Sequence, residues 1–134
     1  MLTRERFHAG SKAAIPLPVL RALLVVAVST LPFDQEFYLS TYPDVRDAFL
    51  SEKVTDLKLH FIEEGYFEGR LGAKPDVDEE FYKENYPDIA AAISRGEVES
   101  GLVHYVQAGA FEGRFANSLD MQVTKRWLEL LGRK

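Results

Sequence analysis

Apolar and polar positions between residues 33 and 116 follow one pattern that is written twice, at a fixed offset of 44 residues. Laid over one another, residues 33–72 and 77–116 align without a gap and are identical at 15 of 40 positions. The recurring positions hold mainly aromatic residues, glycine, proline and helix-capping residues. A fixed period of this length is typical of stacked supersecondary units. The sequence therefore predicts two tandem repeats.

Each repeat begins with signals for two short helices in succession. Asp34 and its counterpart Asp78 stand where an N-cap residue belongs, and an acidic residue follows in the first turn. The first helix has to end near Tyr42, because a proline disfavours the α conformation in the residue before it. Pro43 then suits the first turn of a second helix, where its missing N–H costs nothing. The same signals recur 44 residues later.

A third helix is predicted in each repeat from apolar residues at helical spacing. It contains His60 in the first copy and His104 in the second, and Gly65 or Gly109 follows. We expect these two glycines to take the left-handed conformation just after the helix end. No segment shows the period of two that predicts a strand. The predicted fold class is all-α, with two tandem three-helix repeats packed together, an N-terminal apolar segment and a C-terminal capping helix. Because the repeats are joined so closely, we also expect them to share a core.

Two further segments flank the repeats, which occupy residues 33–74 and 75–116. Residues 1–32 form an N-terminal apolar segment, and residues 117–134 form a C-terminal amphipathic helix that carries the only tryptophan. In that helix, apolar residues recur at helical spacing after a start at Asn117 and Ser118. It is predicted either to cap the repeat stack or to dock on another protein.

Three interpretations of the N-terminal segment stay open. A buried helix packed on the first repeat, which we favour, fits Pro18 followed by the apolar run at residues 22–28. A secretory signal fits the basic start and the small residues Ala27 and Ser29, although Arg21 interrupts its apolar core. A helix on a membrane surface is the third. A spanning helix needs about 20 apolar residues, which Arg21 and two prolines prevent.

Composition and charge exclude several kinds of chemistry. The chain has no cysteine, so disulfides, thiolate metal sites and a cysteine nucleophile are excluded. Residues 33–116 carry 8 Lys and Arg against 18 Asp and Glu, a sum of −10, whereas residues 1–32 sum to +3 and residues 117–134 to +2. Because an acidic body repels phosphate backbones, no nucleic-acid partner is expected.

The ordered motifs of the repeat resemble a known bacterial sequence repeat. The first copy reads Phe33-Asp34, Phe37-Tyr38-Leu39, Tyr42-Pro43-Asp44-Val45, His60-Phe61, Gly65 and Glu68-Gly69-Arg70. This series is similar to the bacterial tandem repeat of Phe-Asp, Tyr-Leu, Asn-Pro-Asp-Val, His-Tyr, Gly and Glu-Gly-Arg type, which occurs beside glycosyltransferases and in surface or secreted proteins. The resemblance covers residues 33–116. It implies a context of cell-surface polysaccharide and favours a cell-envelope location over a cytoplasmic one, but it implies no reaction.

Histidines and acidic residues are the first candidates for a chemical site. His60 and His104 have no second His or Cys at ligand spacing, and the carboxylates after His60 are missing after His104. We expect core histidines bonded to backbone or carboxylate, and no metal or other cofactor. The acidic cluster at residues 76–84 lacks the calcium-loop pattern and is expected to be a solvated helix start. No phosphate loop, nucleophile elbow or distinct carboxylate pair is present, so an enzyme is not expected.

The arginines of the Glu-Gly-Arg motifs allow two interpretations. Arg70 and Arg114 could pair with Asp44 and Asp88 as bidentate staples within each repeat. Alternatively, they could line two equivalent notches that bind an anionic group, such as a uronic acid.

We expect a non-catalytic interaction module associated with bacterial cell-surface polysaccharide. Glycan binding predicts exposed tyrosine and arginine side chains, with these candidates: Arg70, Arg114, Tyr38, Tyr82 and Tyr66. A structural or adaptor subunit instead predicts an exposed apolar face that docks on protein, with these candidates: residues 19–28, Trp127, Leu130 and Leu131. An accessory domain of a glycosyltransferase system is the third hypothesis. The expected partner is thus a surface glycan or a protein; an integral membrane location is not expected, and the oligomeric state stays open.

Overall fold

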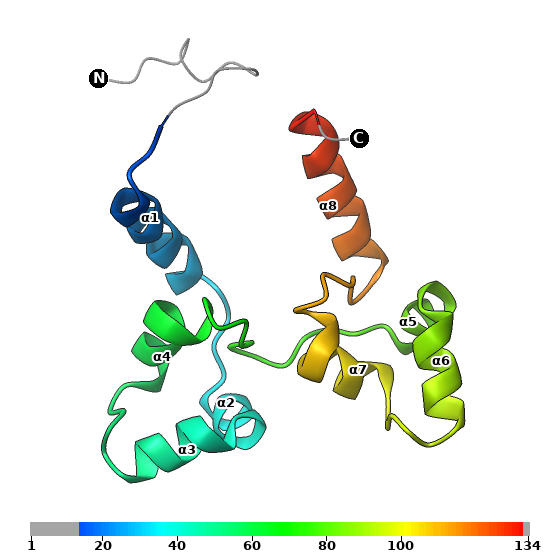
Figure 1. Ribbon diagram of the computed structural model, residues 1–134, viewed down its shortest axis with the longest axis horizontal. Coiled ribbons are helices and arrows are strands. Elements are labelled where there is room, and N and C mark those ends of the chain that lie inside the picture. Colours follow the sequence, from blue (N-terminus) through cyan, green and yellow to red (C-terminus); the bar gives the residue numbers. More distant parts are fainter. Residues whose placement is uncertain (1–13, 133–134) are drawn as a thin grey trace.

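The computed structural model describes residues 14–132, and within that range the chain is entirely helical (Figure 1). The first repeat comprises α2 (Gln35–Thr41), α3 (Pro43–Leu50), α4 (Leu57–His60) and η2 (Phe61–Gly65), a π-helical turn that continues α4. The second repeat has the same order: α5 (Glu79–Asn85), α6 (Pro87–Ser94), α7 (Gly101–His104) and the π-helical turn η3 (Tyr105–Gly109). The predicted fold class is confirmed.

Two longer helices flank the repeats. α1 (Leu17–Ser29) precedes the first repeat, and α8 (Ser118–Leu130) follows the second. Both helices rise from the same side of the repeat body and stand apart from one another there (Figure 1). Residues 1–13 and 133–134 lie outside the described residues, and with them the basic start on which the secretory-signal interpretation depends.

Side-chain caps and prolines set the helix boundaries where the sequence predicts them. The carboxylates of Asp34 and Asp78 each accept a hydrogen bond at 3.0 Å from the amide three residues later. Tyr42 has an extended backbone, with φ −119° and ψ 90°, which ends α2 before Pro43 opens α3. Tyr86 separates α5 from α6 in the same way. These predictions from the sequence are confirmed.

A fully buried tyrosine forms the centre of each repeat. The ring of Tyr38 packs edge-on against Phe33 and Phe61, with centroids 5.4 and 5.8 Å apart. Its counterpart Tyr82 packs against Tyr105 in the same edge-on manner, at 6.1 Å. Burial raises the pKa of both tyrosines to about 12. Both phenols therefore stay neutral far above physiological pH.

Each central tyrosine is hydrogen-bonded to the recurring histidine. The Tyr38 hydroxyl lies 3.1 Å from Nδ1 of His60, and the Tyr82 hydroxyl lies 2.9 Å from Nδ1 of His104. The expectation of hydrogen-bonded structural histidines is confirmed, but the main partner is a phenol rather than a backbone group or a carboxylate. Glu64 lies 3.6 Å from the other ring nitrogen of His60, and the second repeat has alanine at the equivalent position.

The two repeats lie side by side, but the expected shared core is wrong. The buried cluster of the first repeat includes Val28 of α1 and otherwise only residues of that repeat. The repeats meet instead through local contacts, such as that of the Phe111 ring of the second repeat with Gly69 of the first. A fully buried tyrosine gives each 40-residue unit a core of its own.

The glycines after the histidines have a role that differs from the predicted one. Gly65 and Gly109 lie inside the π-helical turns and do not have positive φ, so the left-handed assignment is wrong. The glycines of the Glu-Gly-Arg motifs, Gly69 and Gly113, do have positive φ, at 81° and 73°. At Gly65 and Gly109 a Cβ atom would collide with the hydroxyl of the central tyrosine. These glycines are therefore required for close packing.

The inner face of α1 packs on the first repeat. Val28 is buried in that repeat's core, and Arg21 donates a hydrogen bond to the Glu63 carbonyl at 2.7 Å. The Arg21 guanidinium also lies over the Phe67 ring, 5.0 Å from its centroid. The expected packing of this segment on the first repeat is confirmed for this one face of the helix. The expected burial of the helix is wrong, because Val28 is the only buried residue of α1.

A double-mutant cycle tests the packing of glycine against tyrosine. We expect Gly65→Ala to lower the free energy of unfolding by about 1–3 kcal/mol, because the added methyl overpacks the site. The hydroxyl is absent in Tyr38→Phe/Gly65→Ala, so part of that loss should be recovered, with a coupling energy of about 1 kcal/mol. Urea denaturation of the four proteins measures it.

The second repeat supplies the matched control. Tyr82→Phe combined with Gly65→Ala joins residues of different repeats, and its effects should add. Equal coupling in the matched and crossed pairs would contradict the packing account.

Candidate functional site

The Glu-Gly-Arg arginines form the same clamp in both repeats. Arg70 donates through both terminal nitrogens to the Asp44 carboxylate, at 3.0 and 2.8 Å, and through Nε to Glu68 at 2.9 Å. Arg114 makes the equivalent bonds to Asp88, at 3.2 and 2.9 Å, and to a glutamate two residues before it. The bidentate staple predicted from the sequence is confirmed.

An aromatic ring completes each clamp. The guanidinium of Arg70 lies 5.0 Å from the ring centroid of Tyr42, and that of Arg114 lies 4.8 Å from the centroid of Tyr86. The Tyr42 hydroxyl accepts a hydrogen bond from the Leu71 amide at 2.7 Å, and Tyr86 accepts one from the Phe115 amide at 2.6 Å. The clamp therefore joins the start of the second helix to the chain that leaves the repeat.

The clamp also fixes the charge of its members. The hydrogen bond from Arg70 holds the pKa of the Asp44 carboxyl below its ordinary value, and Arg114 does the same for Asp88. The hydrogen bonds to Asp44 and Asp88 raise the pKa of the two arginines against the opposing effect of burial. These four side chains are charged partners at neutral pH.

Most side chains predicted to bind glycan are buried or already hydrogen-bonded within the repeats. Tyr38 and Tyr82 are fully buried, so the structure corrects their assignment as exposed contact residues. The side chains of Arg70 and Arg114 are only 20% and 21% exposed, and each has three donor nitrogens engaged. Tyr66 is 42% exposed, but its counterpart in the second repeat is alanine. The structure does not present equivalent exposed tyrosines in the two repeats.

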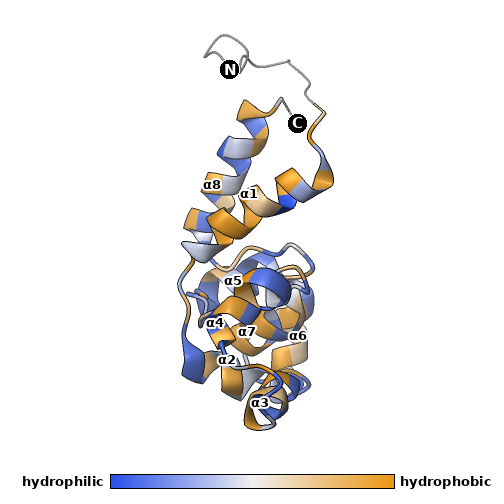
Figure 2. Cartoon of the chain, turned by 90° about the vertical axis from the view of Figure 1, so that its left-hand side faces the viewer, coloured by the Kyte–Doolittle hydropathy of each residue, from blue (hydrophilic) through white to orange (hydrophobic). Residues whose placement is uncertain are grey.

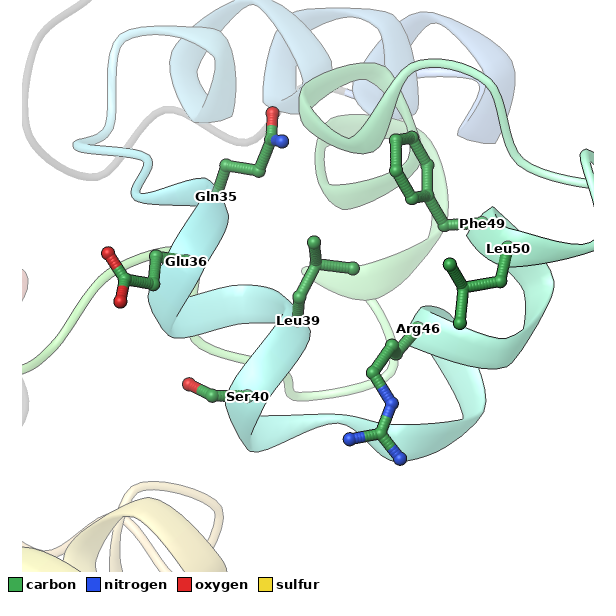
Figure 3. A pocket seen from close by; sticks show the side chains of 7 residues that line it. All are labelled: Gln35, Glu36, Leu39, Ser40, Arg46, Phe49 and Leu50. Carbon is green, nitrogen blue, oxygen red and sulfur yellow. The ribbon is translucent and has the colours of Figure 1, made fainter.

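An open groove between α2 and α3 was not indicated by the sequence. It has a volume of about 630 Å³ and is lined by apolar and polar side chains of both helices (Figure 3): Gln35, Glu36, Leu39, Ser40, Arg46, Phe49 and Leu50. The second repeat has Lys83, Ala90 and Ser94 in place of Leu39, Arg46 and Leu50. The repeat pattern gives no signal for this groove, because its lining is specific to the first copy.

The outer face of α1 is apolar and uncovered. Val19, Leu23 and Val26 are 50%, 58% and 66% exposed, and they lie opposite the face that holds Val28 and Arg21. Figure 2 shows the apolar colouring that runs along α1 above the repeat body. A helix that is apolar all round is normally buried on all sides, and in this chain α1 is covered on one side only.

α8 exposes a second apolar surface on the same side of the body (Figures 1 and 2). It begins at the predicted place, where the Asn117 side chain accepts a hydrogen bond from the Asp120 amide at 2.9 Å, and it buries none of its side chains. The predicted docking residues Trp127, Leu130 and Leu131 are all exposed, with Trp127 at 61%. Their docking role stays a prediction.

We use the name apolar pole for eight of the exposed apolar side chains on and next to these two helices. They are Val19, Leu23 and Val26 of α1, Leu119, Val123, Trp127 and Leu130 of α8, and Leu131, which directly follows α8. Sequence periodicity identified the α8 stripe, and residues 19–28 were candidates for docking. The sequence did not indicate which face of α1 stays exposed, because both faces are apolar.

Together, these features define an all-helical protein with two internally paired repeat units and two exposed apolar helices. No family model, curated protein or solved structure matches the chain. Between residues 14 and 132, no helix has the length and apolar character needed to cross a bilayer. In the same range, no three His, Asp or Glu side chains are grouped so that they could hold a metal ion.

The acid dependence of stability tests the clamp. Because the folded pKa of Asp44 and of Asp88 is depressed, their contribution is complete above the ordinary value of about 3.9 and is lost as the pH falls through the lower folded value. Asp44→Asn/Asp88→Asn should therefore lower the Tm at pH 7, and the difference from wild type should shrink between pH 4 and pH 2.

Thermal unfolding followed by circular dichroism measures this difference. Asp47→Asn is the control, because Asp47 is exposed and only loosely paired with Arg46 at 3.8 Å. A difference between wild type and the clamp variant that stays constant down to pH 2 would show that the clamp carboxylates do not have the assigned role.

Proposed function

We propose that this protein is a non-catalytic structural module that docks on protein through its apolar pole. The observation that carries the proposal is the contrast between the two parts of the molecule. In the repeats, the recurring polar side chains bond one another, whereas most apolar side chains of α1 and α8 remain exposed to water. Large exposed apolar patches are typical of interaction sites.

The length of α8 supports the same proposal. An isolated helix of 13 residues is marginally stable in water, and most helical stability in proteins comes from packing of an amphipathic face. α8 has such a face, but none of its side chains is buried in this chain. A partner that covers the face would supply the missing packing energy.

The repeats suit the role of a rigid support. In each one, the caps, the buried tyrosine and the arginine clamp fix the short helices in one arrangement. α1 is held on the first repeat by Val28 and Arg21, so its outer face has a defined direction. The α1 part of the pole is therefore a preformed surface, which lowers the entropic cost of binding there.

Photo-crosslinking from the pole tests the docking function. A benzophenone amino acid at position 23 or 127 should give discrete ultraviolet-dependent adducts in cells, and mass spectrometry should identify the attached molecule as protein. The same probe at position 47, a polar site on α3, should give none. The proposal fails if positions 23 and 127 give no protein adduct, or if position 47 gives the same ones.

A specific observation favours glycan binding as a second candidate function. The α2–α3 groove combines an apolar floor of Leu39 and Phe49 with polar groups of Gln35, Glu36 and Arg46 at its rim (Figure 3). Sugar rings present both apolar faces and hydroxyl groups, and a site of this mixed character could accept one.

Calorimetric titration distinguishes this candidate from docking. If the groove binds glycan, an acidic oligosaccharide such as an oligogalacturonate should give saturable heat that is lost in Arg46→Ala. Arg95→Ala is the matched control, because Arg95 is an exposed arginine outside the groove whose ion pair is with Glu97. The absence of heat with the wild-type protein would exclude this candidate and leave protein docking.

A further inference from the structure

The apolar pole presents two exposed stripes that a second copy could cover. Its eight side chains are between 48% and 69% exposed, three of them on α1 and five on or directly after α8. A partner's share of a standard protein interface is about 800 Å². An interface of that size has to use both stripes.

The spacing of the exposed residues fits another helix. On the outer face of α1, Val19, Leu23 and Val26 are four and three residues apart, and on α8 the steps from Val123 to Trp127 and Leu130 are the same. A repeat of four and three places side chains in the narrow seam that one helix offers to a second. Both helices of the pole therefore present a ridge that a helical partner could cover.

The distribution of charge favours a second copy of this chain as the helical partner. Over the described residues, the pole helices carry Arg21, Lys125 and Arg126 against Asp120 and Glu129, so they are nearly neutral, whereas residues 33–116 sum to −10. Two copies would repel one another through their repeat bodies and approach most readily through their poles. The first half of α8 is acidic, and its second half is basic on balance. If a second copy of α8 packs antiparallel to the first, each acidic half lies beside a basic half.

The outer face of α1 adds no electrostatic cost to this arrangement. The only charged residue of α1 is Arg21, which lies on the inner face and contacts Glu63 and Phe67. Pairing α1 with itself would therefore bury no unpaired charge, as the centre of a protein interface requires. An anionic bilayer surface is less well matched, because Asp120 and Glu129 cancel the positive charge of α8.

We propose that two copies of this protein form a two-fold dimer in which the apolar poles cover one another. In a two-fold interface each copy presents the same patch, and the helices could meet as α1 with α8 or as each helix with its own copy. The acidic first half and basic second half of α8 favour the second arrangement, in which α1 meets α1 and α8 meets α8. This inference rests on the proposed docking function and identifies the docked protein as a second copy of this chain.

Sedimentation equilibrium of the full chain tests the dimer. We expect a mass that rises with concentration from one chain to two, and a dissociation constant that increases about tenfold or more in Leu23→Glu. Leu50→Glu is the matched control, because it makes the same change at an exposed leucine of α3, away from the pole. It should leave the dissociation constant unchanged, and both variants should keep the wild-type circular dichroism spectrum.

Disulfide trapping gives an independent measurement. Since the chain has no cysteine, Val26→Cys introduces a single thiol on the outer face of α1, and mild oxidation should link two chains near the two-fold axis. Leu50→Cys should remain unlinked under the same conditions.

Three results would overturn the dimer. One is a single-chain mass at every concentration up to about 100 μM, where a dissociation constant in the micromolar range would be visible. Another is an equal response of Leu23→Glu and Leu50→Glu. The third is a monomer that co-sediments with phosphatidylglycerol vesicles and loses this binding in Leu23→Glu, which would assign the pole to a lipid surface. If the first result is accompanied by crosslinking from position 23 to a different protein, the docking function stays in place.

Discussion

In each repeat a buried tyrosine hydroxyl occupies the volume where a side chain of the following helix glycine would lie. The contact brings α2 against the turn that follows α4, and it places the hydroxyl on the ring nitrogen of His60. The same three groups meet in the second repeat at Tyr82, Gly109 and His104. The aromatic packing around the tyrosine depends on this approach, and so does the position of the chain that continues into the arginine clamp. Forty residues with few buried side chains are held together in this way.

Local chemistry explains why much of this fold could be predicted from the sequence. Caps at Asp34 and Asp78 and breaks before Pro43 and Pro87 act within a few residues, and their signals survive in both copies. The arginine staple was also accessible, because an arginine and an aspartate recur together at a constant separation. The packing role of Gly65 could not be predicted in this way. A glycine that ends a helix and one that admits a distant side chain look alike in sequence, and the tyrosine that decides between them is 27 residues away.

The candidate site shows the same limit. Aromatic residues recur in both repeats, but the recurrence does not tell whether a ring is a core residue, as Tyr38 is, or an exposed contact. Similarly, the apolar run of α1 predicts a covered helix, yet the chain provides cover for the Val28 side alone. The exposure of Leu23 and Val26 depends on which other elements pack against α1, and the periodicity of the sequence does not contain this information.

The central claim is that the repeats are self-sufficient supports and that the apolar pole is where binding occurs. Hydrogen–deuterium exchange at increasing protein concentration tests it most directly, because each amide reports its own protection. The account predicts slow exchange in the repeats at every concentration, and fast exchange in α1 and α8 that slows as the concentration rises. Protection that grows in the repeats while α1 and α8 stay unchanged would contradict it.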